Sequence, residues 1–229
     1  SLLLLISPFN TVPALIRVAP PPLPLDVGCC MSVLFLLLMQ SCRKDPLSDL
    51  TFDESRIYVT NNDPDINYTD YTSFSMGDSA VVIDNGFYYT ELTDVDQAYI
   101  DAIKSSMQAR GFVEVSKDDA PDLGINLTRF YSTSTGIIDN GYWGGYGGYY
   151  DPYYWGYGGY GYGGAPFYTT YSYTEGAITL DILDLKNATE NGTINIIWNG
   201  LIRGSGIFSS TTAAGSVDAL FNQSPYIQR

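Results

Sequence analysis

Runs of apolar residues at strand and helix spacing begin after residue 62 and continue to the C-terminus. Val81-Val82-Ile83 is a short apolar run that ends at the turn pair Asn85-Gly86, a pattern typical of a strand that reverses direction. Leu123–Tyr131 alternates apolar residues with small or polar ones, as a strand with two unlike faces does. Shorter runs predict two more strands, at Ile66–Phe74 and Phe112–Val115.

The best-defined helix begins at Thr93 or Asp94. Both positions have the spacing of a capping box, because Thr93 is followed by Asp96 and Asp94 by Gln97 three residues later. Residues at helical spacing indicate one buried face, formed by Val95, Ala98, Tyr99, Ala102, Ile103 and Ser106. Gly111 predicts a left-handed cap at the C-terminal end of this helix.

Apolar residues at every second position on both sides of the turn pair Asn191-Gly192 predict a hairpin. The residues that share the core face of each strand are Ile178, Leu180 and Ile182 before the turn, and Ile194, Ile196 and Trp198 after it. Trp198 is therefore expected in the core, and Ser210–Phe221 predicts a second helix. Together these elements predict an α+β fold, with two helices packed on a mostly antiparallel sheet in one domain.

The segment Gly141–Gly164 departs from this pattern, because 22 of its 24 residues are Gly, Tyr or Trp. It has no aliphatic residues for a core and a high backbone entropy, so it is expected to be a mobile or loosely collapsed loop. Its aromatic rings could stack on sugars or on one another, which makes Trp143, Tyr153, Tyr154 and Trp155 a candidate surface for a ligand or for self-association. The alternative is a tolerated low-complexity insertion.

An apolar run of signal-peptide length, Met31–Met39, precedes the domain and is too short to span a bilayer. It is followed by Gln40-Ser41-Cys42, which resembles the lipobox of bacterial lipoproteins, where the chain is cut before a cysteine that is then acylated. Cys42 is therefore the expected site of lipid attachment and the link to a membrane. On this interpretation residues 1–41 are a leader, with residues 1–30 as upstream translation. Residues 42–62 are a lipid-anchored tether, and residues 63–229 are the domain with its insertion at 141–164.

The composition limits the chemistry that the domain can perform. The formal net charge of -14 argues against nucleic acid as a partner. There is no histidine, and all three cysteines lie at or before Cys42, so the usual zinc ligand and thiolate ligands are absent from the domain. The acidic stretch Asn62–Asp65 with Asp70 offers carboxylates for calcium but lacks the glycine and terminal glutamate of a calcium loop, so an acidic turn is preferred and neither a metal site nor a cofactor is expected. Only carboxylates remain as catalytic groups. Asp181 and Asp184 are three residues apart on one strand, so they should lie on opposite faces, and exposed surface positions are the preferred interpretation of both.

A short motif offers a candidate for modification. Asp78-Ser79-Ala80 is similar to the O-glycosylation site that some Bacteroidetes use in exported proteins, which makes Ser79 a candidate attachment residue.

At the hairpin the sequence resembles a known family. Glu175-Gly176, Leu180–Asp184 and Trp198-Asn199-Gly200 occur in the order of the signature of the 4136 family of domains of unknown function, and Tyr68–Tyr71 and Ala120–Leu123 add further matches. The resemblance implies a bacterial, usually lipid-anchored envelope protein with an α+β domain. It implies no activity and no catalytic residues.

These observations favour a lipid-anchored protein of the outer membrane with a structural or adaptor role and no enzymatic activity. A module that binds glycan or peptidoglycan through the aromatic segment is the alternative, with an envelope glycan or protein as partner. A carboxylate-based hydrolase is the third hypothesis.

Overall fold

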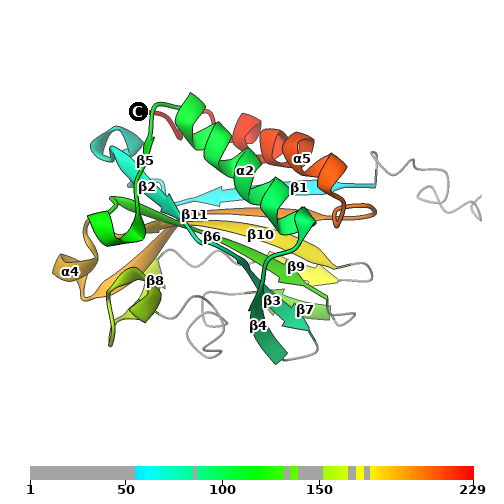
Figure 1. Cartoon of the computed structure of the whole chain (residues 1–229), viewed down its shortest axis with the longest axis horizontal. Coiled ribbons are helices and arrows are strands. Elements are labelled where there is room, and N and C mark those ends of the chain that lie inside the picture. The colour runs from blue at the N-terminus through cyan, green and yellow to red at the C-terminus, as the bar shows by residue number, and fades with distance from the viewer. Residues whose placement is uncertain (1–54, 85–86, 132–134, 139–151, 165–168, 173–175) are drawn as a thin grey trace, which may run out of the picture. The chain divides into compact units, whose positions relative to one another are not determined.

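The computed structural model describes residues 55–84, 87–131, 135–138, 152–164, 169–172 and 176–229. These residues form an α+β domain in which two helices, α2 (Asp94–Ala109) and α5 (Ser210–Gln223), lie side by side on one face of a large sheet (Figure 1). A third helix, α4 (Ala188–Asn191), is a single turn between two strands. None of the helices in these ranges is both long and apolar enough to span a membrane. The predicted fold class is confirmed.

The nine strands of the large sheet are β1 Ile57–Asn62, β2 Ser73–Met76, β3 Ala80–Asp84, β4 Phe87–Glu91, β5 Val113–Glu114, β6 Leu123–Phe130, β8 Gly161–Gly164, β10 Ala177–Asp184 and β11 Thr193–Arg203. The longest path of paired strands across the large sheet contains six strands. One edge of β11 pairs with β8 along its first half and with β1 along its second half. In the same way, one edge of β6 pairs with β2 near its start and with β3 near its end. The central order is β1-β11-β10-β6-β2-β5. The long pairings of β10 are antiparallel, whereas β2 and β3 run parallel to β6, so the sheet is mixed. Two more strands, β7 (Thr135–Ile138) and β9 (Thr169–Ser172), pair antiparallel with each other.

The sheet begins earlier in the chain than the sequence pattern indicates. β1 lies in the last part of the expected tether 42–62, where it pairs antiparallel with the second half of β11. The strand predicted at Ile66–Phe74 is instead a short 3-10 helix, Tyr68–Asp70, followed by β2. The sequence pattern does not predict β1, because polar residues such as Asn61 and Asn62 are unfavourable in strands. These residues form a strand because they pair with β11.

The first helix confirms the capping signal at Thr93. The Thr93 Oγ1 accepts from the Asp96 backbone N–H, and an Asp96 carboxylate oxygen accepts from the Thr93 backbone N–H at 2.7 Å. At the other end Gly111 has a φ of +95°, and the Phe112 N–H bonds to the Met107 carbonyl, as expected for a left-handed cap. The buried face of α2 is rotated slightly from the predicted one, and consists of Asp96, Tyr99, Ile100, Ile103 and Met107.

Trp198 lies in the core, as predicted, but not on the face of Ile194 and Ile196. In the pairing of β10 with β11, Ile182 lies opposite Trp198 while Leu183 lies opposite Ile196, so Ile197 is an extra residue in the strand. This β-bulge reverses the alternation, and Trp198 then points toward the helices while Ile194 and Ile196 point away from them.

The fully buried indole of Trp198 makes close contacts. Its Nε1 donates to the Ser224 Oγ at 2.9 Å, and its ring stacks on Phe221 at 5.6 Å between centroids. A Cβ at Gly200 would lie 2.5 Å from the Trp198 ring and 2.9 Å from Leu220. A residue with a side chain at position 200 would therefore clash with the Trp198 ring, and glycine avoids this clash.

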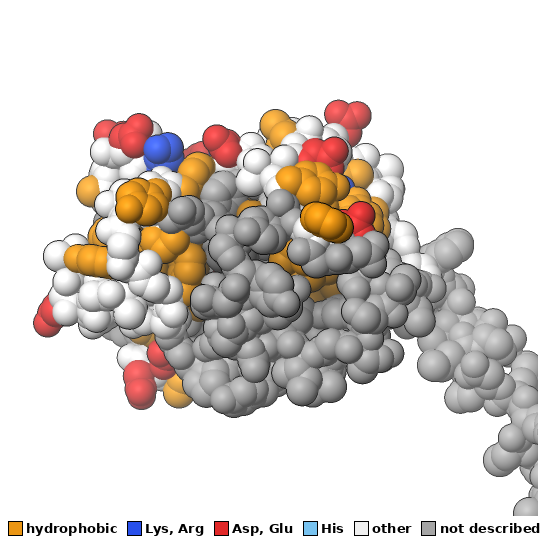
Figure 2. Space-filling view, turned by 90° about the horizontal axis from the view of Figure 1, so that it is seen from below, with side chains coloured by type: hydrophobic (Ala, Val, Ile, Leu, Met, Phe, Trp, Pro, Cys, Tyr) orange, Lys and Arg blue, Asp and Glu red, His pale blue; other side chains and the backbone are white. Residues whose placement is uncertain are grey.

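The second face of the sheet, which carries no long helix, is also buried. Its apolar cluster includes Phe130, Leu183 and Leu201 from the sheet and Trp155 from the aromatic segment. Figure 2 views the molecule from this side, where the apolar side chains of the described residues gather in two groups and Lys and Arg are few.

The described part of the Gly/Tyr-rich segment, Pro152–Gly164, belongs to this second layer. It forms a 3-10 helix (Pro152–Trp155) and then β8, which pairs parallel with the first half of β11. Trp155 is 5% exposed, and a Cβ at Gly124 would lie only 3.2 Å from its indole. The expectation of a loop without core residues is wrong for Pro152–Gly164, because aromatic rings cover the sheet where aliphatic side chains are absent. Residues 141–151 lie outside the described part.

Candidate functional site

The aromatic residues that the sequence suggested as a binding surface have different environments. Trp155 is buried and packs on the sheet, so it cannot be a platform for a ligand. The Tyr154 hydroxyl accepts from the Asp78 backbone N–H at 3.3 Å, and its ring contacts Trp155 edge to face, with Lys117 5.3 Å from the ring centroid. Tyr153 is 73% exposed. Trp143 lies outside the described residues, as does the lipid-attachment candidate Cys42.

The candidate modification residue Ser79 is half-buried and lies immediately before β3. Its hydroxyl donates to the Asp78 carboxylate at 3.1 Å. The hydroxyl is therefore engaged with its neighbour in the chain.

A row of polar side chains crosses four neighbouring strands on the helix-free face. Asn126 of β6 lies opposite Asp181 of β10, Asp181 lies opposite Asn199 of β11, and Asn199 lies opposite Asn61 of β1. Directly opposed residues of paired strands share a face, so these three carboxamides and one carboxylate form a line across the sheet, here named the polar row. The Asn199 Nδ2 donates to the Asp181 Oδ1 at 2.6 Å.

The next pair along the two central strands is polar as well. Thr128 of β6 lies opposite Thr179 of β10, two residues from Asn126 and Asp181 and on the same face. The four side chains have exposed fractions of 0–1%. Within the described part of the chain, both side-chain polar atoms of Asn126 and the hydroxyls of Thr128 and Thr179 have no hydrogen-bond partner. Buried polar groups without partners are rare in folded proteins, so this group is a candidate site.

The buried aspartates correct one prediction from the sequence. Asp181 is 0% and Asp184 3% exposed, so the expectation of exposed surface positions is wrong for both. They do lie on opposite faces, as predicted: Asp181 pairs with Asn126 and Asp184 with Leu123, which is part of the core beneath the helices. The cause of the error is that both faces of β10 are covered, which the alternation of polar and apolar residues along one strand does not reveal.

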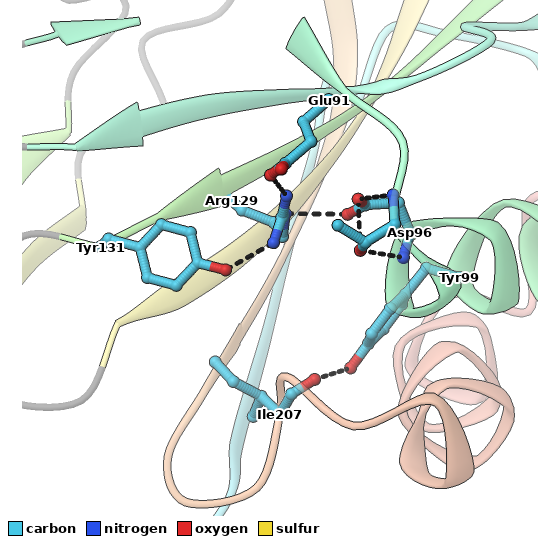
Figure 3. A network of polar contacts seen from close by, with 7 residues as sticks. Glu91, Asp96, Tyr99, Arg129, Tyr131 and Ile207 are labelled. Atoms are coloured by element: carbon cyan, nitrogen blue, oxygen red, sulfur yellow. Dashed lines mark hydrogen bonds and ion pairs between the residues drawn. The ribbon is translucent and has the colours of Figure 1, made fainter. Parts of the chain in front are cut away.

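A second polar network lies under α2 and joins three elements (Figure 3). The Arg129 guanidinium of β6 pairs with Asp96 of α2 at 2.8 Å and with Glu91 of β4 at 2.6 Å, and donates to the Tyr131 hydroxyl at 2.5 Å. The Arg129 side chain is 5% exposed and Asp96 is fully buried. Since Asp96 also caps α2, the network fixes the start of that helix on the sheet, which is a structural role.

Other carboxylates also hold the fold together. Asp184 accepts from the backbone N–H and the Nδ2 of Asn187, at 3.0 and 2.8 Å. Burial and the charge of Asp184 raise the pKa of Tyr71 well above its ordinary value. Partial burial alone would raise the pKa of Asp122. Hydrogen bonds from Thr72 and Ser73 outweigh that effect, and the pKa of Asp122 is lowered.

Two open hollows are lined by described residues, and neither of them brings two carboxylates together. One open hollow of about 640 Å³ lies beside β5 and one of about 320 Å³ lies between α2 and α5; each is lined by a single carboxylate, Glu114 and Asp218 respectively. Among the residues that the structure describes, no three Cys, Asp or Glu side chains are grouped so that they could hold a metal ion.

Sequence reasoning missed the polar row and the two threonines. Each strand shows only alternating polar residues, which usually indicate a solvent-facing side. The sequence does contain one relevant signal: β6 has two polar residues two positions apart, Asn126 and Thr128, and β10 has two at the same spacing, Thr179 and Asp181. This signal can be interpreted only when the register that places the two pairs opposite each other is known.

The comparisons with known proteins agree with the resemblance seen in the sequence. The model of DUF4136, a domain of unknown function, matches residues 58–226. A DUF4136 family protein from Bacteroides thetaiotaomicron has a similar structure, with 27% sequence identity and a TM-score of 0.64 over 77% of this chain and 99% of that one. A PDZ domain protein from Parabacteroides distasonis has 12% identity and a TM-score of 0.41 over 76% of this chain and 37% of that one, which is too low to establish a common fold. No curated protein is detectably similar to this chain.

Proposed function

This chain belongs to the family DUF4136, a domain of unknown function, and from that premise we propose that it is a lipoprotein of the bacterial cell envelope. In this proposal Cys42 carries the lipid, the outer membrane is the location, and the domain has a structural or adaptor role without catalysis. The observation that carries the proposal is the order of the sequence. The apolar run Met31–Met39 leads directly to Gln40-Ser41-Cys42, and the cysteine-free domain follows.

The contacts of the carboxylates support a role without catalysis. Asp96 pairs with Arg129 and caps a helix, Asp122 holds the start of β2, and Asp184 accepts two hydrogen bonds from Asn187. Each of these groups is engaged in stabilising the fold. A pair of catalytic carboxylates has to flank a substrate at about 5–10 Å from each other, with room between them.

Metabolic labelling with a fatty-acid analogue tests the anchor. The wild-type protein should incorporate the label and fractionate with membranes, and Cys42→Ser should do neither. Cys30→Ser is the matched control, because Cys30 precedes the apolar run and should be irrelevant to acylation. Labelled Cys42→Ser protein refutes the anchor. Separation of inner and outer membranes on a density gradient tests the location, and recovery with the inner membrane contradicts it.

A second candidate function, binding of glycan or peptidoglycan, is favoured by the setting of Tyr153. Its ring occupies the space beside Gly158, where a Cβ would lie 2.2 Å from the ring, while the side chain is 73% exposed. A ring held against a glycine with its remaining surface in solvent is suited to stacking on a sugar.

Sedimentation with purified peptidoglycan sacculi tests this second candidate. Tyr153→Ala should reduce the bound fraction, and Gly158→Ala should do so by displacing the ring. Gly161→Ala is the control, since a Cβ there meets no atom within 4 Å. Equal binding of Tyr153→Ala and wild type excludes the tyrosine as a sugar platform.

A further inference from the structure

Strand β4 has a free edge within the described part of the chain, where it pairs with β3 alone. The Tyr131 N–H donates to the Ile83 carbonyl, so every second residue of β3, counted from Ile83, bonds to β6, and the residues between them bond to β4. Tyr88 and Thr90 lie opposite residues of β3 that bond to β6. Their own N–H and C=O groups therefore point away from the sheet and are placed to pair with another strand.

This edge has little of the protection that natural sheets give to an outer strand. The usual devices are prolines, lysines, bulges or a covering element. β4 has the sequence Phe-Tyr-Tyr-Thr-Glu, and its register with β3 has no shift. Phe87 is 76% and Tyr89 48% exposed, and Thr90 is exposed as well. The edge is therefore accessible to an extended chain.

The side chains along the edge are largely aromatic. Phe87, Tyr89 and Glu91 lie on one face of β4, since they are two positions apart. Glu91 pairs with Arg129, which in turn pairs with α2, so this is the face on the side of the helices. Leu92, directly after the strand, is 52% exposed. Exposed apolar side chains gathered in one place are typical of an interaction surface.

The charge around β4 selects the kind of partner. Residues 57–103, which contain β4, have nine Asp and Glu and no Lys or Arg. The Arg129 guanidinium pairs with both Glu91 and Asp96, at 2.6 and 2.8 Å, so one positive charge balances two carboxylates. Asp94, in the first turn of α2, is exposed. A second copy of this chain, with a net charge of -14, is repelled, whereas a segment that carries Arg or Lys is attracted.

We propose that β4 binds an extended segment of a partner protein, which adds a strand to the sheet and carries Arg or Lys at alternate positions. The outward backbone groups of Tyr88 and Thr90 bond to that segment, as in other cases of β-strand addition. Residues of the segment that lie opposite Phe87, Tyr89 and Glu91 share their face, so these are the positions for the cationic side chains.

A cation at these positions has two kinds of partner. It can lie over the face of an aromatic ring of β4, and it can pair with the Glu91 carboxylate. The inference goes beyond the proposed function, because it depends neither on acylation of Cys42 nor on the aromatic ring of Tyr153.

Fluorescence anisotropy with the full chain tests the proposal. The probe is a labelled peptide of alternating Arg and Thr. One control peptide has Glu in place of Arg. The other keeps Arg but is N-methylated at its Thr residues, whose amides are the ones that bond to Tyr88 and Thr90. The wild type should bind the probe saturably and each control about tenfold or more weakly. Equal binding of the N-methylated peptide overturns the proposal, because the attraction is then one of charge alone.

Variants locate the binding on β4. Thr90→Pro removes an outward N–H that the pairing with β3 does not use, and an edge strand tolerates such a proline, so the variant should keep its Tm and bind the probe about tenfold more weakly. Tyr89→Thr keeps a residue that favours strands, removes the ring and should also weaken binding. Tyr153→Thr, which changes an exposed tyrosine outside β4, should bind as the wild type does.

The proposal is overturned if Thr90→Pro and Tyr89→Thr bind the probe as tightly as the wild type, and Tyr89→Thr alone decides if Thr90→Pro does not fold. Sedimentation velocity examines the other occupant of this edge. A wild-type dimer that Thr90→Pro converts to a monomer assigns β4 to a second copy of the chain and overturns the proposal, whereas a monomeric wild type agrees with it.

Discussion

Replacing Arg129 by methionine should strongly destabilise the domain, because it leaves the Asp96 carboxylate buried without its counter-ion. Asp96 is fully buried under the sheet-facing side of α2, and Arg129 lies 2.8 Å from it with only 5% of its own side chain exposed (Figure 3). Methionine fills a similar volume, so the loss is mainly electrostatic. Glu91, whose side chain is 45% exposed, also loses its partner at 2.6 Å but can be solvated instead.

The expected magnitude follows from burial. Removing one partner of a buried ion pair costs about 3–5 kcal/mol, because the other charge stays desolvated. The pairing with half-exposed Glu91 adds at most about 1 kcal/mol, as surface ion pairs do. The capping hydrogen bonds of Asp96 to Thr93 remain and keep the carboxylate partly satisfied, so the lower end of the range, about 3–4 kcal/mol, is expected.

Urea denaturation followed by circular dichroism measures the effect, in a cycle of Arg129→Met, Asp96→Asn and the double variant. Asp96→Asn keeps a capping acceptor without the charge, so the double variant should be less destabilised than the sum of the two by about 1–3 kcal/mol. Lys104→Met is the control, because the Lys104–Glu114 pair at 2.6 Å is about one-third exposed and should contribute about 1 kcal/mol or less. A loss for Arg129→Met no larger than that of Lys104→Met, or strict additivity in the cycle, refutes the reasoning.

Trp198→Ala should lower the free energy of unfolding by about 3–5 kcal/mol in urea denaturation, since the indole is fully buried against Phe221 and Ser224; an unchanged midpoint contradicts its place in the core. Deleting Pro152–Gly164 should abolish the cooperative thermal transition, because Trp155 and β8 cover the second face of the sheet, and retention of a sharp transition shows that this layer is dispensable. The lowered pKa of Asp122 makes its contribution to stability present above the unfolded value of about 3.9, and lost as the pH falls through the folded value. The difference in Tm between wild type and Asp122→Asn should therefore shrink from pH 7 to about pH 3, and a constant difference counts against an ionic role.

The amino-acid sequence by itself determined the elements whose signals are local. The capping residues Thr93 and Asp96 and the left-handed Gly111 set the two ends of α2 within a few residues of chain. The alternation in β10 was sufficient to place Ile178, Leu180 and Ile182 together on the face that packs beneath the helices. The order of the motifs along the chain was sufficient to identify the family. Such signals need only contacts within one turn or one strand, which the chain makes wherever it folds.

Only the tertiary structure decided which neighbours each helix and strand packs against, and which of its faces are buried. The bulge at Ile197 turns Trp198 away from Ile194, and it exists only in the pairing of β10 with β11. Trp155 became a core residue because Gly124, far away in the chain, leaves room for its ring. The polar residues of β6 and β10 became a buried group because two strands meet in one register and their second face is covered. A strand's own pattern tells which residues share a side, but whether that side is buried depends on partners distant in the sequence.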